Sequence, residues 1–295
     1  MTLGELMKVS IVVPVYNEIQ SIEQCITDLT TEMESLAYEY EIIVVDDGSS
    51  DQTVEAIQDD SILVLKHPQN RGYGAALKTG IKCATGDIIA ITDADGTYAA
   101  SNLPRLLDLL VQEQYDMVVG ARTGEEVSIP WARRPLKWLL TMFASLLVGT
   151  QIPDLNSGQR VFRRDAALEF FHLYPNGFSF TSTITLAMLT NDYYIFFEPI
   201  NYLPRVGRSK IRPIQDTISF FLLVIRIVVY FKPLKVFLPL SLFLFGLAIV
   251  VLLGSYFWMD QVMDITTVII AMAAVQIAAT GLLADVITKM RSGKL

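Results

Sequence analysis

The chain has 295 residues, of which 52% are hydrophobic and only 18% are charged, and its formal net charge is −8. This composition is more apolar than that of a typical soluble domain. The acidic balance argues against a nucleic acid as the partner, because such proteins carry a basic patch for the phosphates. The length allows one large domain and a smaller appendage.

The first part of the chain alternates strands with helices. An apolar run over Val9–Val15 predicts a buried strand, and apolar residues at helical spacing predict a helix after it. A second run, Glu41–Val45, ends at Asp46 and Asp47. These carboxylates could accept hydrogen bonds from a ribose or a base, with a simple turn as the alternative. We expect a helix over Asp51–Gln58 after them.

A third strand is expected over Ser61–Leu65, followed by the glycine-flanked start of a helix over Ala75–Ala84. Gly72 and Gly74 lack the third glycine of a dinucleotide fingerprint, but the helix start could still receive a phosphate on its N–H groups. His67, in the preceding loop, is expected to have a packing or surface role.

The most informative stretch joins the apolar residues Ile88–Ile91 to Asp93-Ala94-Asp95. The unbroken, β-branched run predicts a strand buried on both faces. The two carboxylates then follow its carboxyl end, where open α/β sheets keep their ligand crevice. Carboxylates at this spacing repel one another unless a cation such as Mg²⁺ or Mn²⁺ binds them. An acidic turn without a ligand is the alternative, and this motif alone does not decide between them.

Further runs predict a helix over Asn102–Glu113 and strands over Asp116–Gly120 and Gln159–Phe162. The alternation indicates an α/β fold with a mostly parallel sheet and helices on both sides. Leu136–Val148 carries tryptophan and lysine, which fits a helix in the membrane interface or a packed helix of the domain. Asp154 is a third acidic loop position.

The C-terminal part is typical of a membrane protein. Val236–Trp258 has 23 residues without a charge and Ile265–Ala284 has another 20, so each can cross a hydrocarbon core of about 30 Å. Buried helices of a soluble core are the alternative, which two successive segments of this length disfavour. Ile214–Phe231 contains Asp216 and Arg226, and we expect it to lie in the interface without spanning.

Charge predicts the topology of this region. Basic residues flank the two apolar segments, whereas the hinge between them carries only acidic ones, which favours both ends in the cytosol. The first residues show no secretory signal pattern, so the N-terminal domain is expected to stay in the cytosol. We expect a cytosolic domain over residues 1–212 and a juxtamembrane interfacial helix over residues 213–235. Two membrane spans are expected over residues 236–258 and 265–287.

Two features of the same region suggest partners. Leu203–Lys235 holds seven basic residues against one acidic residue, which suggests contact with anionic lipid headgroups or a phosphate ligand. In the last span, Ala274 and Ala278 lie among other small residues, and such a face permits close helix packing and therefore a homo-oligomer.

Six short motifs occur in order along residues 9–212. They are Val13-Pro14-x-Tyr16-Asn17-Glu18, Asp46-Asp47-Gly48-Ser49-x-Asp51, Asn70-x-Gly72-x-Gly74-x-Ala76, Gly86-Asp87-x5-Asp93-Ala94-Asp95, Asp154-x-x-Ser157-Gly158-x-Arg160 and Arg205-x-Gly207-x-Ser209-Lys210. This set resembles the family 2 glycosyltransferases of GT-A fold. Within that family it is similar to the polyprenyl-phosphate group, which includes the dolichol-phosphate mannose synthases and their bacterial glucosyl relatives.

The resemblance implies a hexosyltransferase that uses UDP-glucose or GDP-mannose, a polyprenyl phosphate acceptor and Mg²⁺ or Mn²⁺. The metal would be held by Asp93 and Asp95. The nucleotide-sugar would contact Pro14, Tyr16, Glu18, Asp46, Asp47, Lys78, Asp93, Ala94, Asp95, Ser209 and Lys210. The acceptor phosphate would meet Arg122, Arg134 and Arg205, and the catalytic group would be Asp93, Asp95, Asp154 and Arg205.

Three hypotheses follow for the function. The first is a single in-line displacement by the lipid phosphate with inversion at the anomeric carbon; this nucleophile is already ionised and does not require a general base. In this hypothesis Asp154 orients the acceptor or the sugar and is not the base. The second is a membrane-tethered transferase that acts on a lipid or glycan hydroxyl, which would require a carboxylate base. The third is a non-catalytic membrane scaffold.

Overall fold

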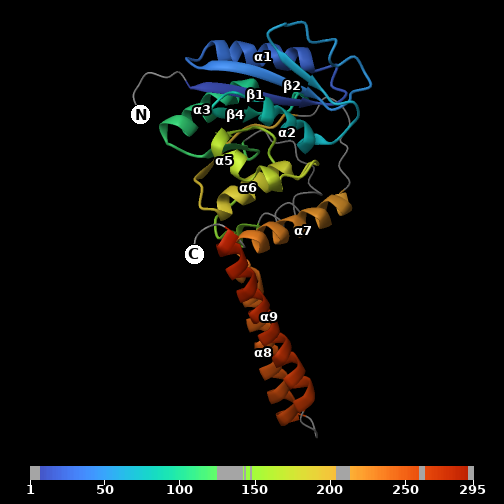
Figure 1. Ribbon diagram of the computed structural model, residues 1–295, viewed down its shortest axis with the longest axis vertical. Helices are drawn as coiled ribbons and strands as arrows, with labels where there is room; N and C mark the ends of the chain where they lie inside the picture. Colours follow the sequence, from blue (N-terminus) through green and yellow to red (C-terminus); the bar gives the residue numbers. More distant parts are fainter. Residues whose placement is uncertain are drawn as a thin grey trace. The chain divides into compact units, whose positions relative to one another are not determined.

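The structure is a computed structural model that describes residues 7–124, 142, 144–146, 148–203, 213–258 and 263–291, except for the side chains of residues 213–220 and 291. The chain divides into two compact units, Met1–Phe221 and Leu222–Leu295. Figure 1 shows the sheet and its helices in the first unit and the long helices of the second.

The first unit is built on a seven-stranded sheet with the strand order β3-β2-β1-β4-β6-β5-β7. Strand β6 runs antiparallel to both of its neighbours, β4 and β5, and every other pair is parallel. The sheet is therefore mostly parallel, as the sequence predicted. The strands are β1 Lys8–Val15, β2 Glu39–Asp46, β3 Leu63–Lys66, β4 Ile88–Ile91, β5 Met117–Ala121, β6 Arg160–Arg163 and β7 Ile195–Pro199.

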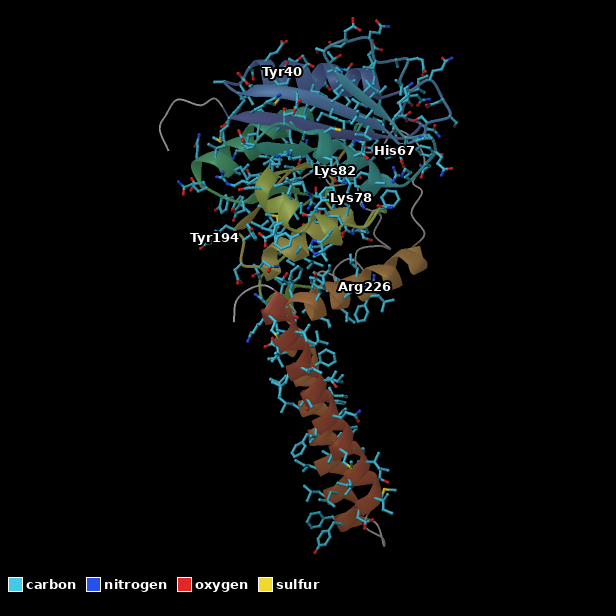
Figure 2. The ribbon with its side chains drawn as sticks, viewed as in Figure 1. Tyr40, His67, Lys78, Lys82, Tyr194 and Arg226 are labelled. Carbon is cyan, nitrogen blue, oxygen red and sulfur yellow. The ribbon has the colours of Figure 1, made fainter. Side chains whose placement is uncertain are left out.

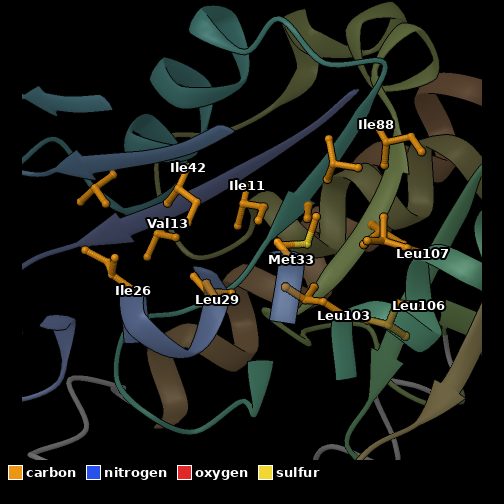
Figure 3. Packing of buried hydrophobic residues seen from close by; sticks show 14 of the residues in the cluster. Ile11, Val13, Ile26, Leu29, Met33, Ile42, Ile88, Leu103, Leu106 and Leu107 are labelled. Atoms are coloured by element: carbon orange, nitrogen blue, oxygen red, sulfur yellow. The ribbon is translucent and has the colours of Figure 1, made fainter. Parts of the chain in front are cut away.

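Helices cover both faces of the sheet, as was also predicted (Figure 1). On one face, α1 and α3 bury an apolar core against β1, β2 and β4, and Figure 3 shows Leu29 and Met33 of α1 near Ile11 of β1. On the other face, α2 lies so close that a Cβ atom at Gly80 would overlap the side chain of Val12. The helices are α1 Ile22–Glu34, α2 Tyr73–Cys83, η1 Ala100–Asn102, α3 Leu103–Gln112, α5 Arg164–Glu169, η3 Phe171–Leu173 and α6 Phe180–Thr190.

One predicted helix is wrong. The segment Asp51–Gln58 forms turns, and the carboxylate of Asp51 accepts hydrogen bonds from the backbone N–H and the hydroxyl of Thr53. The Thr53 hydroxyl oxygen in turn accepts the backbone N–H of Glu18 at 2.9 Å. Side chains that bond to nearby backbone groups in this way compete with helical hydrogen bonds. The segment therefore connects the tips of β1 and β2.

The second unit contains long apolar helices. They are α8 Leu234–Trp258 and α9 Asp264–Arg291, preceded by α7 Pro213–Phe231, which crosses the boundary between the units. The hydroxyl of Ser241 on α8 donates to the carbonyl of Ala274 on α9 at 2.8 Å. A Cβ atom at Gly281 would lie 2.5 Å from that of Phe237, so the helices are in close contact there. By length and composition, Leu234–Phe257 and Asp264–Met290 could each cross a membrane.

Candidate active site

The predicted acidic positions lie along one edge of the sheet. Strands β1, β2 and β4 are parallel neighbours, and Val15 at the end of β1 pairs with Asp46 at the end of β2. In the same register, Val12 pairs with Ile91, the last residue of β4. The loops after these strands therefore emerge at the same edge, which is where ligands bind in open α/β sheets. Asp93 lies two residues beyond the end of β4, at this edge.

Two contacts fix the carboxylate of Asp93. The phenol of Tyr73, the first residue of α2, donates to Oδ1 at 2.9 Å. The other oxygen, Oδ2, lies against Gly158, where an added Cβ would overlap it. Burial, together with the nearby Asp93, raises the pKa of Tyr73 well above its ordinary value. The phenol therefore keeps its proton at neutral pH and can act as the donor.

Asp95 is held by its own turn. Its Oδ1 accepts the backbone N–H of Thr97 at 3.1 Å and the Thr97 hydroxyl at 2.5 Å. Ala94, between the two aspartates, is buried. Gly96 has φ +73°, a conformation that favours glycine, and the space beside it is open. The turn thus places both carboxylates at the strand end with restricted side-chain freedom.

Hydrogen bonds hold the loop that contains Ser157 and Gly158, which lies against Asp93. The backbone N–H of Gly158 donates to the Tyr98 phenol oxygen at 2.7 Å, and the Ser157 hydroxyl donates to the carbonyl of Gly120 at 2.5 Å. Arg160, which is fully buried, donates to the carbonyls of Ser157 and Thr181. Burial lowers the pKa of Arg160 to about 10, which still leaves it charged at neutral pH.

Asp154 and Arg122 lie together, although the sequence assigned them to different roles. Arg122 donates from Nε to Oδ2 of Asp154 at 2.7 Å and from Nη2 to Oδ1 at 2.9 Å. Asp154 is fully buried, and the Arg122 guanidinium lies 5.2 Å from the ring centroid of Tyr202. The Arg122 guanidinium thus occupies both oxygens of the Asp154 carboxylate. That Asp154 orients the acceptor or the sugar stays a prediction.

Asp46 and Asp47 make different contacts. Asp47 accepts the backbone N–H groups of Arg71 at 2.9 Å and Gly72 at 2.8 Å, and its Oδ1 lies 2.7 Å from His67 Nδ1. Asp47 therefore holds the loop before α2. His67 is buried, which favours the packing role over the surface role that the sequence also allowed. Asp46 accepts the backbone N–H of Ser49 at 2.9 Å. Nucleotide binding by either carboxylate stays a prediction.

The sequence left open that the start of α2 receives a phosphate, but this helix start packs against the loop before α6. A Cβ atom at Gly72 or Gly74 would overlap the backbone of this loop, and the N–H of Ala75 donates to Asn176 O at 3.0 Å. Lys78, which Figure 2 shows on α2, donates to the carbonyl of Tyr174 at 3.0 Å. Burial lowers the pKa of Lys78, with smaller effects from its cationic neighbours.

The remaining predicted residues fall into two groups. Pro14 is the half-buried residue before the last one of β1, and Tyr16 and Glu18 lie in the loop after that strand. The others, Arg134, Arg205, Ser209 and Lys210, lie outside the described residues. Sequence reasoning quoted Arg160 in a motif without giving it a role, and it missed Tyr73 and Tyr98, for which no sequence signal was apparent.

The donor chemistry at Asp93 and Asp95 fits a hard divalent cation. Both side chains offer oxygen ligands at a strand end. Within the described residues, no group of three or more His, Cys, Asp or Glu side chains could complete a metal site. Two carboxylates with the remaining positions left to substrate phosphates are the usual arrangement for Mg²⁺.

Two family models match the chain. Residues 10–171 match Glycosyl transferase family 2, and residues 232–290 match the GtrB C-terminal hairpin. A curated relative is the low-salt glycan biosynthesis hexosyltransferase Agl6 of Haloferax volcanii, with 34% identity over 212 residues. The match covers 70% of this chain and 50% of that protein, so the chain spans about half the length of this relative.

Solved structures share the fold of the first unit. The crystal structure of glucosyl-3-phosphoglycerate synthase from Mycobacterium tuberculosis with Mn²⁺, UDP and phosphoglyceric acid has a TM-score of 0.58 and 20% identity, covering 76% of this chain and 78% of that one. The complex with Mn²⁺, UDP-glucose and phosphoglyceric acid has a TM-score of 0.56 and 20% identity, covering 78% and 83%. At this identity the likeness concerns the fold alone.

Proposed function

The chain belongs to glycosyl transferase family 2, and from this premise we propose that it transfers a hexose, glucose or mannose, from a nucleotide-sugar to a polyprenyl phosphate at the cytosolic face of a membrane. The observation that carries the proposal is the combination, on one chain, of a family 2 region over residues 10–171 with a GtrB C-terminal hairpin over residues 232–290. The hexosyltransferase relative supports the same reaction class.

Asp93 and Asp95 hold Mg²⁺ or Mn²⁺ in this proposal. The cation, when bound, supplies positive charge that stabilises the diphosphate leaving group. Tyr73 and the Gly158 loop keep the Asp93 carboxylate in place, and the Thr97 turn does the same for Asp95. The presence of Mn²⁺ with UDP in the structural neighbours supports a divalent cation in this fold.

The nucleotide lies along the tips of β1 and β2. Pro14, Tyr16, Glu18 and Asp46 line the base and ribose, while Asp47 contributes by shaping the loop before α2. Lys78, Ala94, Ser209 and Lys210 complete the predicted donor contacts.

The acceptor phosphate meets arginines. A phosphate monoester has a second pKa of about 6, so it is mostly dianionic at pH 7 and attacks without a general base. Arg122, pre-oriented by Asp154, offers a fixed guanidinium for such an anion, and Arg134 and Arg205 are the further predicted contacts. A single displacement of this kind inverts the configuration at the anomeric carbon.

The second unit anchors the enzyme. Helices α8 and α9 span the membrane, with the catalytic domain and the C-terminus in the cytosol. Their flanking lysines and arginines and the acidic hinge between them support this topology. Within α7, Arg226 is exposed beside exposed Phe221 and Leu222, a combination that suits a helix lying in the interface (Figure 2).

The direct test is sugar transfer from radiolabelled UDP-glucose and GDP-mannose to undecaprenyl phosphate, by the full chain in detergent with Mn²⁺ or with EDTA. We expect an acid-labile lipid product from one donor, formed with Mn²⁺ and lost with EDTA. If neither donor yields a lipid product although one of them binds, the polyprenyl phosphate proposal is wrong. A hydroxyl acceptor or a scaffold role would then replace it.

A further inference from the structure

We propose that Tyr73 is a positioning residue of the donor site: its phenol holds the Asp93 carboxylate in the orientation in which that carboxylate binds the divalent cation. The inference rests on the proposed function, because the cation is the one assigned there to Asp93. It adds a residue that lies 20 positions away in the sequence and that donates to Asp93 Oδ1 at 2.9 Å.

Neighbouring groups hold the Tyr73 phenol in its position. Tyr73 begins α2, and the residue before it, Gly72, has φ +102° and donates its N–H to Asp47 at 2.8 Å. The ring of Tyr73 stacks on Phe178, with 5.7 Å between centroids and 18° between planes. The start of the helix and the loop before α6 therefore fix the phenol from two sides, so the hydrogen bond is made by a rigid donor.

The second carboxylate oxygen is restricted from the opposite side. Oδ2 of Asp93 lies against Gly158, where no side chain would fit, and the N–H of Gly158 is held by the Tyr98 phenol at 2.7 Å. A donor on one oxygen and a fixed backbone beside the other leave the carboxylate little freedom to rotate. Hydrogen bonds of this kind orient metal ligands in proteins, and their loss typically weakens metal binding by about 10- to 100-fold.

The test is Mn²⁺ binding to the full chain in detergent with UDP present, followed by the electron paramagnetic resonance signal of free Mn²⁺. We expect Tyr73→Phe, which keeps the ring and loses only the hydroxyl, to weaken Mn²⁺ binding by about 10-fold or more. The matched control is Tyr193→Phe, because the Tyr193 phenol also donates to a carboxylate, that of Glu169 at 2.5 Å, away from the strand end. The control should bind Mn²⁺ like the wild type.

A second variant guards against a folding defect in the first. Phe178 is 66% exposed, so Phe178→Ala should leave the fold intact while it removes the stacking partner of Tyr73. We expect this variant to weaken Mn²⁺ binding by several-fold, with an unchanged melting temperature for the metal-free protein. Wild-type Mn²⁺ affinity in Tyr73→Phe would overturn the inference, whatever the affinity of Phe178→Ala.

A third variant separates this inference from the proposed function. Asp93→Asn should lose Mn²⁺ binding if the metal is held as proposed. If Asp93→Asn loses Mn²⁺ and Tyr73→Phe keeps it, the role of Tyr73 alone is wrong. If Asp93→Asn itself binds Mn²⁺ normally, the metal assignment fails and the inference about Tyr73 fails with it.

Discussion

Arg122 and Asp154 form a two-point ion pair, with Nε 2.7 Å from one carboxylate oxygen and Nη2 2.9 Å from the other. The backbone N–H of Arg122 also donates to Asp154 at 3.1 Å. The pair is neutral as a whole, but because Asp154 is fully buried and the Arg122 side chain is 17% exposed, it holds the guanidinium in a fixed orientation close to the surface. A guanidinium oriented in this way can bind a phosphate without the entropic cost of ordering a free arginine.

Replacing Asp154 by Asn should therefore affect both stability and acceptor binding. The amide leaves one guanidinium N–H opposite an NH₂ group, and breaking a buried pair typically costs about 3–5 kcal/mol. We expect a clear fall in melting temperature. We also expect the KM for polyprenyl phosphate to rise more than the KM for the nucleotide-sugar.

The matched control is Glu198→Gln, because the Arg105–Glu198 pair is at 3.3 Å with Arg105 62% exposed. An exposed pair of this kind contributes at most about 1 kcal/mol. A proportionate rise in both KM values for Asp154→Asn would contradict the acceptor role.

Asp93→Asn should abolish turnover. The substitution keeps the size of the side chain but removes the charge that attracts the cation, and metal stabilisation of a leaving diphosphate contributes several kcal/mol, or about 10³-fold in rate. Sugar transfer with saturating Mn²⁺ measures the effect. Asp87→Asn is the control, because Asp87 is exposed and precedes the opposite end of β4. A near-normal rate for Asp93→Asn would refute the metal assignment.

Glu41 should make the stability of the first unit depend on pH. Burial acts to raise its pKa, but hydrogen bonds from Ser10 and from the N–H and hydroxyl of Thr85, with Lys8 nearby, lower the pKa from 4.5 to about 2. A carboxyl with a lowered pKa in the folded state stabilises the fold above its unfolded pKa and loses this contribution as the pH falls through the folded one. The loss should occur between pH 4.5 and about 2.

Thermal unfolding of Glu41→Gln and of the wild type across this pH range measures the contribution of Glu41 to stability. Above pH 4.5 the variant should be less stable than the wild type by about 1–3 kcal/mol, and the difference should shrink toward pH 2. Glu113→Gln, which changes an exposed glutamate after α3, should leave the pH profile as in the wild type. A constant difference between Glu41→Gln and wild type at all pH values would contradict the titration of this group.

Gln276 should contribute to a homo-oligomer. It is exposed near the middle of α9, and among the described residues its side-chain amide has no hydrogen-bond partner. An amide in hydrocarbon gains by pairing with another amide, and the same group on a second copy is both donor and acceptor. Ala279 and Thr280, on the same face, are small enough for close approach.

Sedimentation in detergent measures this association. Gln276→Leu should weaken it by about 1 kcal/mol, or roughly fivefold, and shift the distribution toward monomer. Met272→Leu, one turn earlier on the same face, exchanges one apolar side chain for another and should sediment as the wild type does. If the wild type is monomeric at all concentrations, or if Gln276→Leu associates equally well, the prediction is wrong.

Much of the fold was predictable because it is encoded locally. The β-branched runs of β1, β2 and β4 predict strands within a few residues of their observed bounds, and the uncharged segments predict α8 and α9. The acidic residues after β2 and β4 could also be placed at one sheet edge, since parallel strands bring their carboxyl ends together. Periodicity and composition over a few residues are sufficient for conclusions of this kind.

The contacts between loops depended on the tertiary structure. The sequence predicted a helix over Asp51–Gln58, but the partners that hold this segment in turns include the N–H of Glu18 at the tip of β1. The carboxylates of Asp93 and Asp154 were identified from the sequence, whereas their partners, Tyr73 and Arg122, lie 20 and 32 positions away. A side chain's hydrogen-bond partner is chosen by distance and direction in the folded chain. Residue type and local spacing carry neither, and so the sequence determined which groups are available and the fold decided which of them meet.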